Sequence, residues 1–262
     1  MPEGHSNGVP GVVTRTTPAR ITTALAPPHH FFATGTLPCP YVEGQNERKL
    51  VVELFGHDAP DFYNNLSRAG FRRSHSLAYR PACVGCGQCV PVRIPVAEFL
   101  ESRSLRRIRN ANRDLQAGTG VARADHDQFH LFQRYQRSRH AESDMAAMTY
   151  TDYRTMVEDT PLTTALVRLR DRDGVLHGAC LADMLDDGVS AVYSFYDPAE
   201  GKRGLGTMLI LSLVDEARWR RLPYVYLGYW IAASPKMAYK SRFLPHEILT
   251  ANGWRRISRN RA

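Results

Sequence analysis

The order of predicted elements between residues 163 and 230 is the feature that most constrains the fold of this chain. Three apolar stretches rich in strand-forming residues precede a glycine-rich loop, an apolar helix and one more strand. The segments "DRDG" and "DDG" predict a turn and a hairpin between the first three. The predicted strands are 163–170, 175–185, 189–196 and 223–230, the loop is 197–206, and the helix is 207–222. The pattern predicts an α/β (α+β) domain.

This order resembles the core of the GCN5-related acyltransferase (GNAT) fold, in which a glycine-rich loop leads into a helix. Unpaired backbone N–H groups at that point can hold an anion, so Gly204 and Gly206 are candidate substrate-binding residues. A plain turn is the alternative. The usual acetyl-CoA pattern has Gln or Arg three positions before the first glycine, where this chain has Gly201. We therefore expect no acyl-CoA.

The first half contains shorter predicted elements around a cysteine-rich segment, followed by helices. The predicted strands are 49–55, 77–81 and 89–96, the predicted helices are 59–71, 104–115 and 127–140, and a break is expected at "AGTG" (117–120). We expect a disordered tail over 1–36, an N-terminal α/β subdomain with a cysteine knuckle and many Arg over 37–116, and a GNAT-like transferase domain over 117–262.

Positive charge is concentrated in residues 67–123. This window has eleven Arg and three acidic residues, which equals the net charge of +8 of the whole chain. Arg is suited to bidentate phosphate contacts. The window predicts a nucleic-acid partner, with a solvated basic face as the alternative.

Hydropathy and the N-terminus bear on location. No apolar run approaches 18 residues, so no membrane partner is expected. The N-terminus lacks the apolar core of a secretory signal, although its composition resembles a transit peptide. The five cysteines do not suit a secreted disulfide framework. We expect a cytoplasmic protein.

Three of the five cysteines lie in seven residues, at Cys83, Cys86 and Cys89. A tetrahedral thiolate site needs a fourth ligand, which Cys39 in "LPCPY" offers. This set predicts a structural or regulatory zinc ion, or an iron–sulfur cluster. Reduced free thiols and a disulfide are the alternatives. The fifth, Cys180, lies in a predicted strand and is expected in the core.

Several motifs occur in a fixed order and carry a family resemblance. They are "CPYV" (39–42), "GFRRS" (70–74), "YRPACVGCGQCVPVRIP" (79–95), "YSFYDP" (193–198), "LGT" (205–207), "YVYLGYWI" (224–231) and "SPKMAYKSRF" (234–243). The chain resembles the bacterial aspartate/glutamate leucyltransferases, relatives of the arginyl-tRNA–protein transferases, over about residues 37–254. The eukaryotic relatives carry four cysteines in matching regions, which supports the metal prediction.

The resemblance implies transfer of leucine from leucyl-tRNA to the N-terminal Asp or Glu of a protein, which marks it for degradation by the N-degron route. The alternatives are transfer from arginyl-tRNA, an acyl-CoA N-acetyltransferase, and a zinc-knuckle nucleic-acid-binding module without catalysis.

Aminoacyl transfer has simple chemical requirements. The acceptor amine must be held in line with the ester carbonyl, must lose a proton, and needs donors for the tetrahedral oxyanion. No covalent enzyme intermediate is required. We therefore expect no cofactor for the chemistry itself.

Four residues are candidates for the reaction. Asp197 follows the strand "YSFY" and could bind or deprotonate the amine, although Asp-Pro is also a turn signal. Tyr196 and Tyr229 could orient the ester or donate to the oxyanion, although each could be a core aromatic. His140 is a possible base or a structural histidine.

Cations are the candidates for substrate binding. A bidentate Arg suits an acidic acceptor side chain, so Arg80 and Arg93, which flank the cysteines, are candidate readers. Lys236, Lys240 and Arg242 form a cationic cluster that could bind tRNA phosphate or the acceptor carboxylate, with an exposed loop as the alternative.

Overall fold

A computed structural model describes residues 28–258 of the chain and contains three sheets. The strands are β1 (Phe31–Ala33), β2 (Leu37–Pro38), β3 (Asn46–Glu47), β4 (Lys49–Glu53), β5 (Arg72–Ser74), β6 (Leu77–Pro81), β7 (Val90–Pro95), β8 (Gln116–Val121), β9 (Thr164–Arg170), β10 (Leu176–Met184), β11 (Gly188–Tyr196), β12 (Tyr224–Trp230), β13 (His246–Thr250) and β14 (Gly253–Ile257). The helices are α1 (Ala59–Arg68), α2 (Arg103–Ala111), α3 (His126–Arg139), α4 (Tyr150–Glu158), α5 (Leu205–Trp219) and α6 (Pro235–Ala238), with 3-10 turns η1 (Asp144–Ala147), η2 (Pro198–Arg203) and η3 (Tyr239–Arg242).

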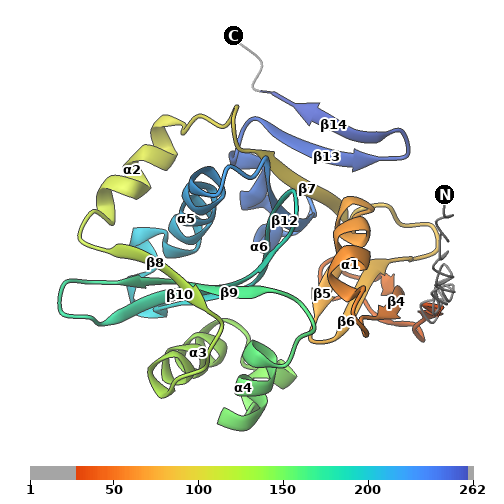
Figure 1. The fold of residues 1–262 in the computed structure, drawn as a ribbon, viewed down its shortest axis with the longest axis horizontal. Coiled ribbons are helices and arrows are strands. Elements are labelled where there is room, and N and C mark those ends of the chain that lie inside the picture. The colour runs from red at the N-terminus through yellow and green to blue at the C-terminus, as the bar shows by residue number, and fades with distance from the viewer. Residues whose placement is uncertain (1–27, 259–262) are drawn as a thin grey trace, which may run out of the picture.

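The predicted order of the second half is confirmed. Strands β9, β10 and β11 form an antiparallel meander, η2 and α5 follow, and β12 pairs parallel to β11. Gly204 caps α5 in the left-handed conformation at φ 68°, which glycine adopts without a Cβ penalty. The chain is thus a mixed α/β protein built on a large sheet (Figure 1).

Helices cover both faces of the eight-stranded sheet, whose order is β14-β13-β7-β12-β11-β10-β9-β8. Helix α5 lies against one face, between the sheet and α2, while α3 and α4 lie on the other (Figure 1). Phe129 and Phe132 of α3 are buried with Tyr153 and Phe195, so they form part of the core on this face of the sheet.

The N-terminal half is not separate from this sheet. Strand β7 lies between β12 and β13, with Ile94 opposite Val225, so the sheet crosses the predicted boundary at residue 116. The remaining strands of this half form a smaller sheet, β1-β4-β6-β5, with α1 beside it.

Two local predictions were wrong. Residues 117–120, expected as a break, lie within β8, because an edge strand that bonds only to β9 tolerates glycine. Residues 31–33, expected in a disordered tail, pair with β4. Most of that predicted tail lies outside the described residues. Within residues 28–258, no helix combines the length and apolar character needed to span a bilayer.

A buried ion pair attaches the smaller sheet to the larger one. Arg73 of β5 donates through Nε and Nη2 to the carboxylate of Asp183 in β10, at 2.7 to 3.0 Å, and both side chains are fully buried. Thr164 also donates to Asp183. Together these bonds satisfy a carboxylate that has no access to water.

We expect Asp183→Asn to lower the free energy of unfolding by about 3–5 kcal/mol, because it leaves the Arg73 charge buried without compensation. Asp186→Asn is a matched control, since Asp186 pairs with Arg68 but is 50% exposed, and should cost under about 1 kcal/mol. Urea unfolding measures both. Equal losses would contradict the structural role of the buried pair.

Candidate active site

The site is a cavity of about 1010 Å³ that opens where β11 and β12 separate. These parallel strands pair only over Gly188–Ser190 and Tyr224–Tyr226. Beyond that point residues 191–194 of β11 and Leu227 of β12 line the cavity. Backbone groups that no longer meet a partner strand must be satisfied in another way.

Arg72 of β5 fills the opening between the strands. Its Nη2 donates to the carbonyls of Ala191 and Val192 at 2.9 and 2.8 Å. A Cβ built on Gly228 of β12 would lie 2.5 Å from the guanidinium carbon, so only glycine leaves room there. Gly228 also has φ 71°, a conformation that favours glycine. Arg72 therefore keeps β11 and β12 apart and lines the cavity.

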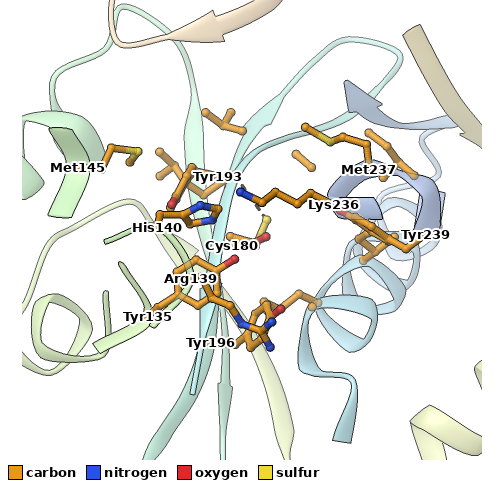
Figure 2. A pocket seen from close by; sticks show the side chains of 18 of the residues that line it. Tyr135, Arg139, His140, Met145, Cys180, Tyr193, Tyr196, Lys236, Met237 and Tyr239 are labelled. Atoms are coloured by element: carbon orange, nitrogen blue, oxygen red, sulfur yellow. Dashed lines mark hydrogen bonds between the residues drawn. The ribbon is translucent and has the colours of Figure 1, made fainter. Parts of the chain in front are cut away.

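The walls come from elements far apart in the sequence. Helix α3 contributes Tyr135 and Arg139, and Lys236 and Tyr239 lie opposite them, with Cys180 between (Figure 2). The N-terminal half contributes Tyr41 and Tyr79. The remaining wall is the start of α5, where a Cβ on Gly206 would lie 2.9 Å from the Tyr196 ring. Both halves of the chain thus build one site.

The charges on the cavity wall have one sign. Among the described residues, its lining includes no Asp or Glu, whereas five Arg and Lys side chains and two histidines contribute to it. These are Arg72, Arg73, Arg139, Lys236, Lys240, His75 and His140. Such a cavity favours anionic ligands.

Lys240 is the most deeply buried lysine on this wall, with 4% exposure. Its Nζ donates to the carbonyl of Tyr229 at 2.6 Å. Burial lowers the pKa of Lys240 well below its usual value, and the neighbouring charge of Arg72 lowers it further.

Two other groups in the cavity are held neutral. Burial lowers the pKa of His140, and the charges of Lys236 and Arg139 act in the same direction. Burial raises the pKa of Cys180 to about 12, so it is a thiol at neutral pH. Cys180 is buried in the main core cluster, which confirms the sequence interpretation.

Five predicted site residues line the cavity: Tyr196, Gly204, Gly206, Lys236 and Lys240. His140 lines it as well. Tyr135 packs edge-on against Tyr196, with ring centroids 4.9 Å apart. The structure therefore places some of the residues predicted from the sequence in one site.

Two predicted catalytic residues lie outside the cavity lining. The Asp197 carboxylate caps η2 by accepting from the Ala199 amide at 2.9 Å, and it pairs with Arg134. The Tyr229 hydroxyl lies 2.9 Å from the carbonyl of Gly70 and 3.1 Å from that of Tyr79, and it donates to them. In these contacts Asp197 stabilises the start of η2, and Tyr229 connects β12 to the backbone near β5 and β6.

The remaining predicted cations also lie outside it. Arg93 donates to Glu247 at 2.7 Å and lies between the rings of Tyr224 and Trp254. Arg80 donates to the Ala69 carbonyl, and Arg242 is exposed. The contacts of Arg93 stabilise the pairing of β7 with β13.

Sequence reasoning missed Arg72, Tyr135 and Arg139 as site residues. Arg72 lay within the quoted motif "GFRRS", but nothing in the spacing separated it from ten other Arg in the same window. Tyr135 lies on α3 at helical spacing from Phe129 and Phe132, a pattern that is typical of a core face.

The four predicted thiol ligands are neighbours. Burial raises the pKa of the Cys89 thiol to about 11. Cys83, Cys39 and Cys86 lie close enough to Cys89 to act in the same direction. Within residues 28–258, however, no three side chains of His, Cys, Asp or Glu are arranged to hold a metal ion. The thiols as they stand do not fit a closed metal site.

Comparison with known proteins identifies the family. Residues 37–107 and 127–250 match the models "Arginine-tRNA-protein transferase, N terminus" and "Arginine-tRNA-protein transferase, C terminus". The chain is 56% identical to an aspartate/glutamate leucyltransferase of Paramagnetospirillum magneticum, over 89% of this chain and 96% of that protein. It is 54% identical to those of Granulibacter bethesdensis, over 88% and 86%, and of Rhodospirillum rubrum, over 87% and 93%. The chain therefore belongs to the aspartate/glutamate leucyltransferases, within the aminoacyl-tRNA–protein transferase family.

Proposed function

We propose that this protein transfers leucine from leucyl-tRNA to proteins that begin with Asp or Glu, by direct attack of the acceptor amine on the aminoacyl ester. The observation that carries this proposal is the cationic cavity, whose described lining has no carboxylate. It suits two anionic partners, the 3′ end of a tRNA and an acidic N-terminal side chain. Both substrates meet in the cytoplasm, where we expect the enzyme to act.

The lining also favours leucine over arginine as the transferred group. Met145, Met148, Met156 and Leu181 line the cavity and offer an apolar surface that adapts to a branched side chain. An arginyl group would add a further cation beside Arg72, Arg139 and Lys236. Like charges in a partly enclosed site repel each other.

Helix α2 offers a route for the tRNA toward the cavity. Arg103, Arg106 and Arg107 are exposed on it. Its side chain Ile108 lies against Gly204 at the start of α5, where a Cβ would lie 3.3 Å from it. Phosphates that follow α2 would therefore lead the aminoacylated end into the site.

Arg72 is suited to act on the reacting carbonyl. In the described part of the chain its Nη2 alone donates hydrogen bonds, so Nε and Nη1 remain as donors. A fixed cation next to the ester would stabilise the oxyanion that forms on attack. The chemistry itself needs no cofactor.

A transfer assay tests the function. Purified protein should transfer labelled leucine from leucyl-tRNA to peptides that begin with Asp or Glu, and not to matched peptides that begin with Asn or Gln. The same peptides with arginyl-tRNA test the arginyl alternative, and acetyl-CoA with the same peptides tests an acetyltransferase. Absence of transfer from any charged tRNA would exclude the proposal.

We expect Gly228→Ala to reduce the transfer rate by at least about tenfold, because its Cβ would collide with the Arg72 guanidinium. Gly174→Ala is the matched control. Gly174 has φ 82° and nothing within 4 Å of an added Cβ, so it carries the same backbone strain without the collision. Single-turnover rates and thermal unfolding separate the two effects. Similar rates for both variants would contradict the role of Arg72.

We also propose that Cys39, Cys83, Cys86 and Cys89 bind zinc or an iron–sulfur cluster, which requires the four side chains to lie closer together than in this structure. The support is the proximity of four thiols, a residue type that binds metals as the deprotonated thiolate. Elemental analysis should find one zinc ion or iron with sulfide per chain, and Cys86→Ala should abolish it. Protein without either after anaerobic purification would exclude the site.

A further inference from the structure

Lys240 is a buried amine without an acidic partner. Among residues 28–258 no carboxylate lies within ion-pair distance of its Nζ, and its hydrogen bond goes to the backbone carbonyl of Tyr229. A lysine buried without a counter-ion is costly, since desolvation of its charge has no compensation. Lys240 lies in the wall of the proposed reaction cavity.

We propose that Lys240 is the general base that removes a proton from the α-ammonium group of the acceptor. This rests on the proposed function, because it assigns a role within the transfer reaction. Lys240 reaches the cavity from η3, on the wall that also carries Lys236 and Tyr239.

The geometry suits this task in two ways. The bond to Tyr229 holds Nζ in place with one N–H, which leaves its lone pair for an incoming proton. Arg72, on β5, shares the same wall and hydrogen-bonds to Ala191 and Val192. It therefore stays charged and disfavours a second cation nearby.

Other groups around Lys240 do not restore its positive charge. Cys89, before β7, favours the charged form, but less strongly than burial and Arg72 oppose it. The Lys240 hydrogen bond goes to Tyr229 and not to a cysteine. The other titratable side chains that line the cavity are Tyr41, Arg73, His75, Tyr79, Tyr135, Arg139, His140, Cys180, Tyr193, Tyr196, Lys236 and Tyr239.

The proton and bond changes balance without another reactant. Lys240 takes one proton from the acceptor ammonium, and the neutral amine attacks the ester carbonyl carbon. The new C–N bond forms as the C–O bond to the terminal ribose breaks. The ribose oxygen leaves as a hydroxyl with the second proton from the attacking nitrogen, and the Lys240 ammonium returns its proton to water.

Lys240→Arg and Lys240→Met test the proposal. Arg keeps a positive charge but cannot act as a base near neutral pH. Both variants should lose about 10²- to 10⁴-fold in single-turnover rate, the usual contribution of a positioned base. Lys49→Met is the control, because Lys49 on β4 pairs with Glu47 of β3 and does not line the cavity.

The pH profile gives a readout that a structural role would not change. Without a base, only acceptor molecules that are already neutral react. The rate of both variants should then rise about tenfold per pH unit below the amine pKa of about 7.7–8.0, while the natural protein rises less steeply. A Lys240→Arg variant with the natural rate and profile would overturn the proposal, as would a Lys240→Met variant whose loss is confined to the acceptor KM.

Unfolding provides a second test that does not depend on activity. A lysine that is neutral when folded binds its proton only in the unfolded chain, so its stability contribution increases as pH rises toward 10.5. The natural protein should gain unfolding temperature relative to Lys240→Met between pH 7 and 10. No relative gain would also overturn the proposal.

These outcomes separate the two claims. If the natural protein transfers no leucine, the proposed function fails. If it transfers leucine and Lys240→Arg matches it, only the assignment of the base fails.

Discussion

Two hydrogen bonds from Arg72 to the carbonyls of Ala191 and Val192 keep β11 and β12 apart, and the cavity depends on them. Parallel strands that separate inside a protein leave carbonyls without partners, and each costs free energy when buried. The guanidinium group satisfies two of them and brings a cation to the same place. The adjacent pair of Arg73 and Asp183 holds β5 where Arg72 can reach. Arg72 thus contributes both to the separation of the two strands and to the positive charge of the cavity.

Cations gather around this cavity at a cost to the empty protein. Arg73 is paired with Asp183, but among the described lining residues no carboxylate offsets the other cations, so these repel each other until an anionic substrate enters. The cost is limited where a group can lose its charge, as burial favours for Lys240 and His140. Arg72 and Arg139 keep theirs. The site therefore combines fixed charges, which can bind an anion, with a neutral amine and a neutral imidazole, which can accept a proton.

Much of the fold could be predicted because its elements carry strong local patterns. The meander, the glycine-rich loop and α5 follow from apolar periodicity and turn residues. β8 was missed because its glycines resemble a break, and only its pairing with β9 makes it a strand. The family resemblance was confirmed.

The site could be predicted only in part. Tyr196 and Tyr229 look alike in sequence, yet the first lines the cavity and the second donates to backbone carbonyls. Which aromatic or Arg reaches a cavity is decided by contacts across more than a hundred residues, such as Arg72 with Ala191. The place of β7 has a consequence for synthesis of the chain. Ile94 of β7 pairs with Val225 of β12, which is synthesised about half a chain later. The large sheet therefore cannot form completely until most of the chain has left the ribosome.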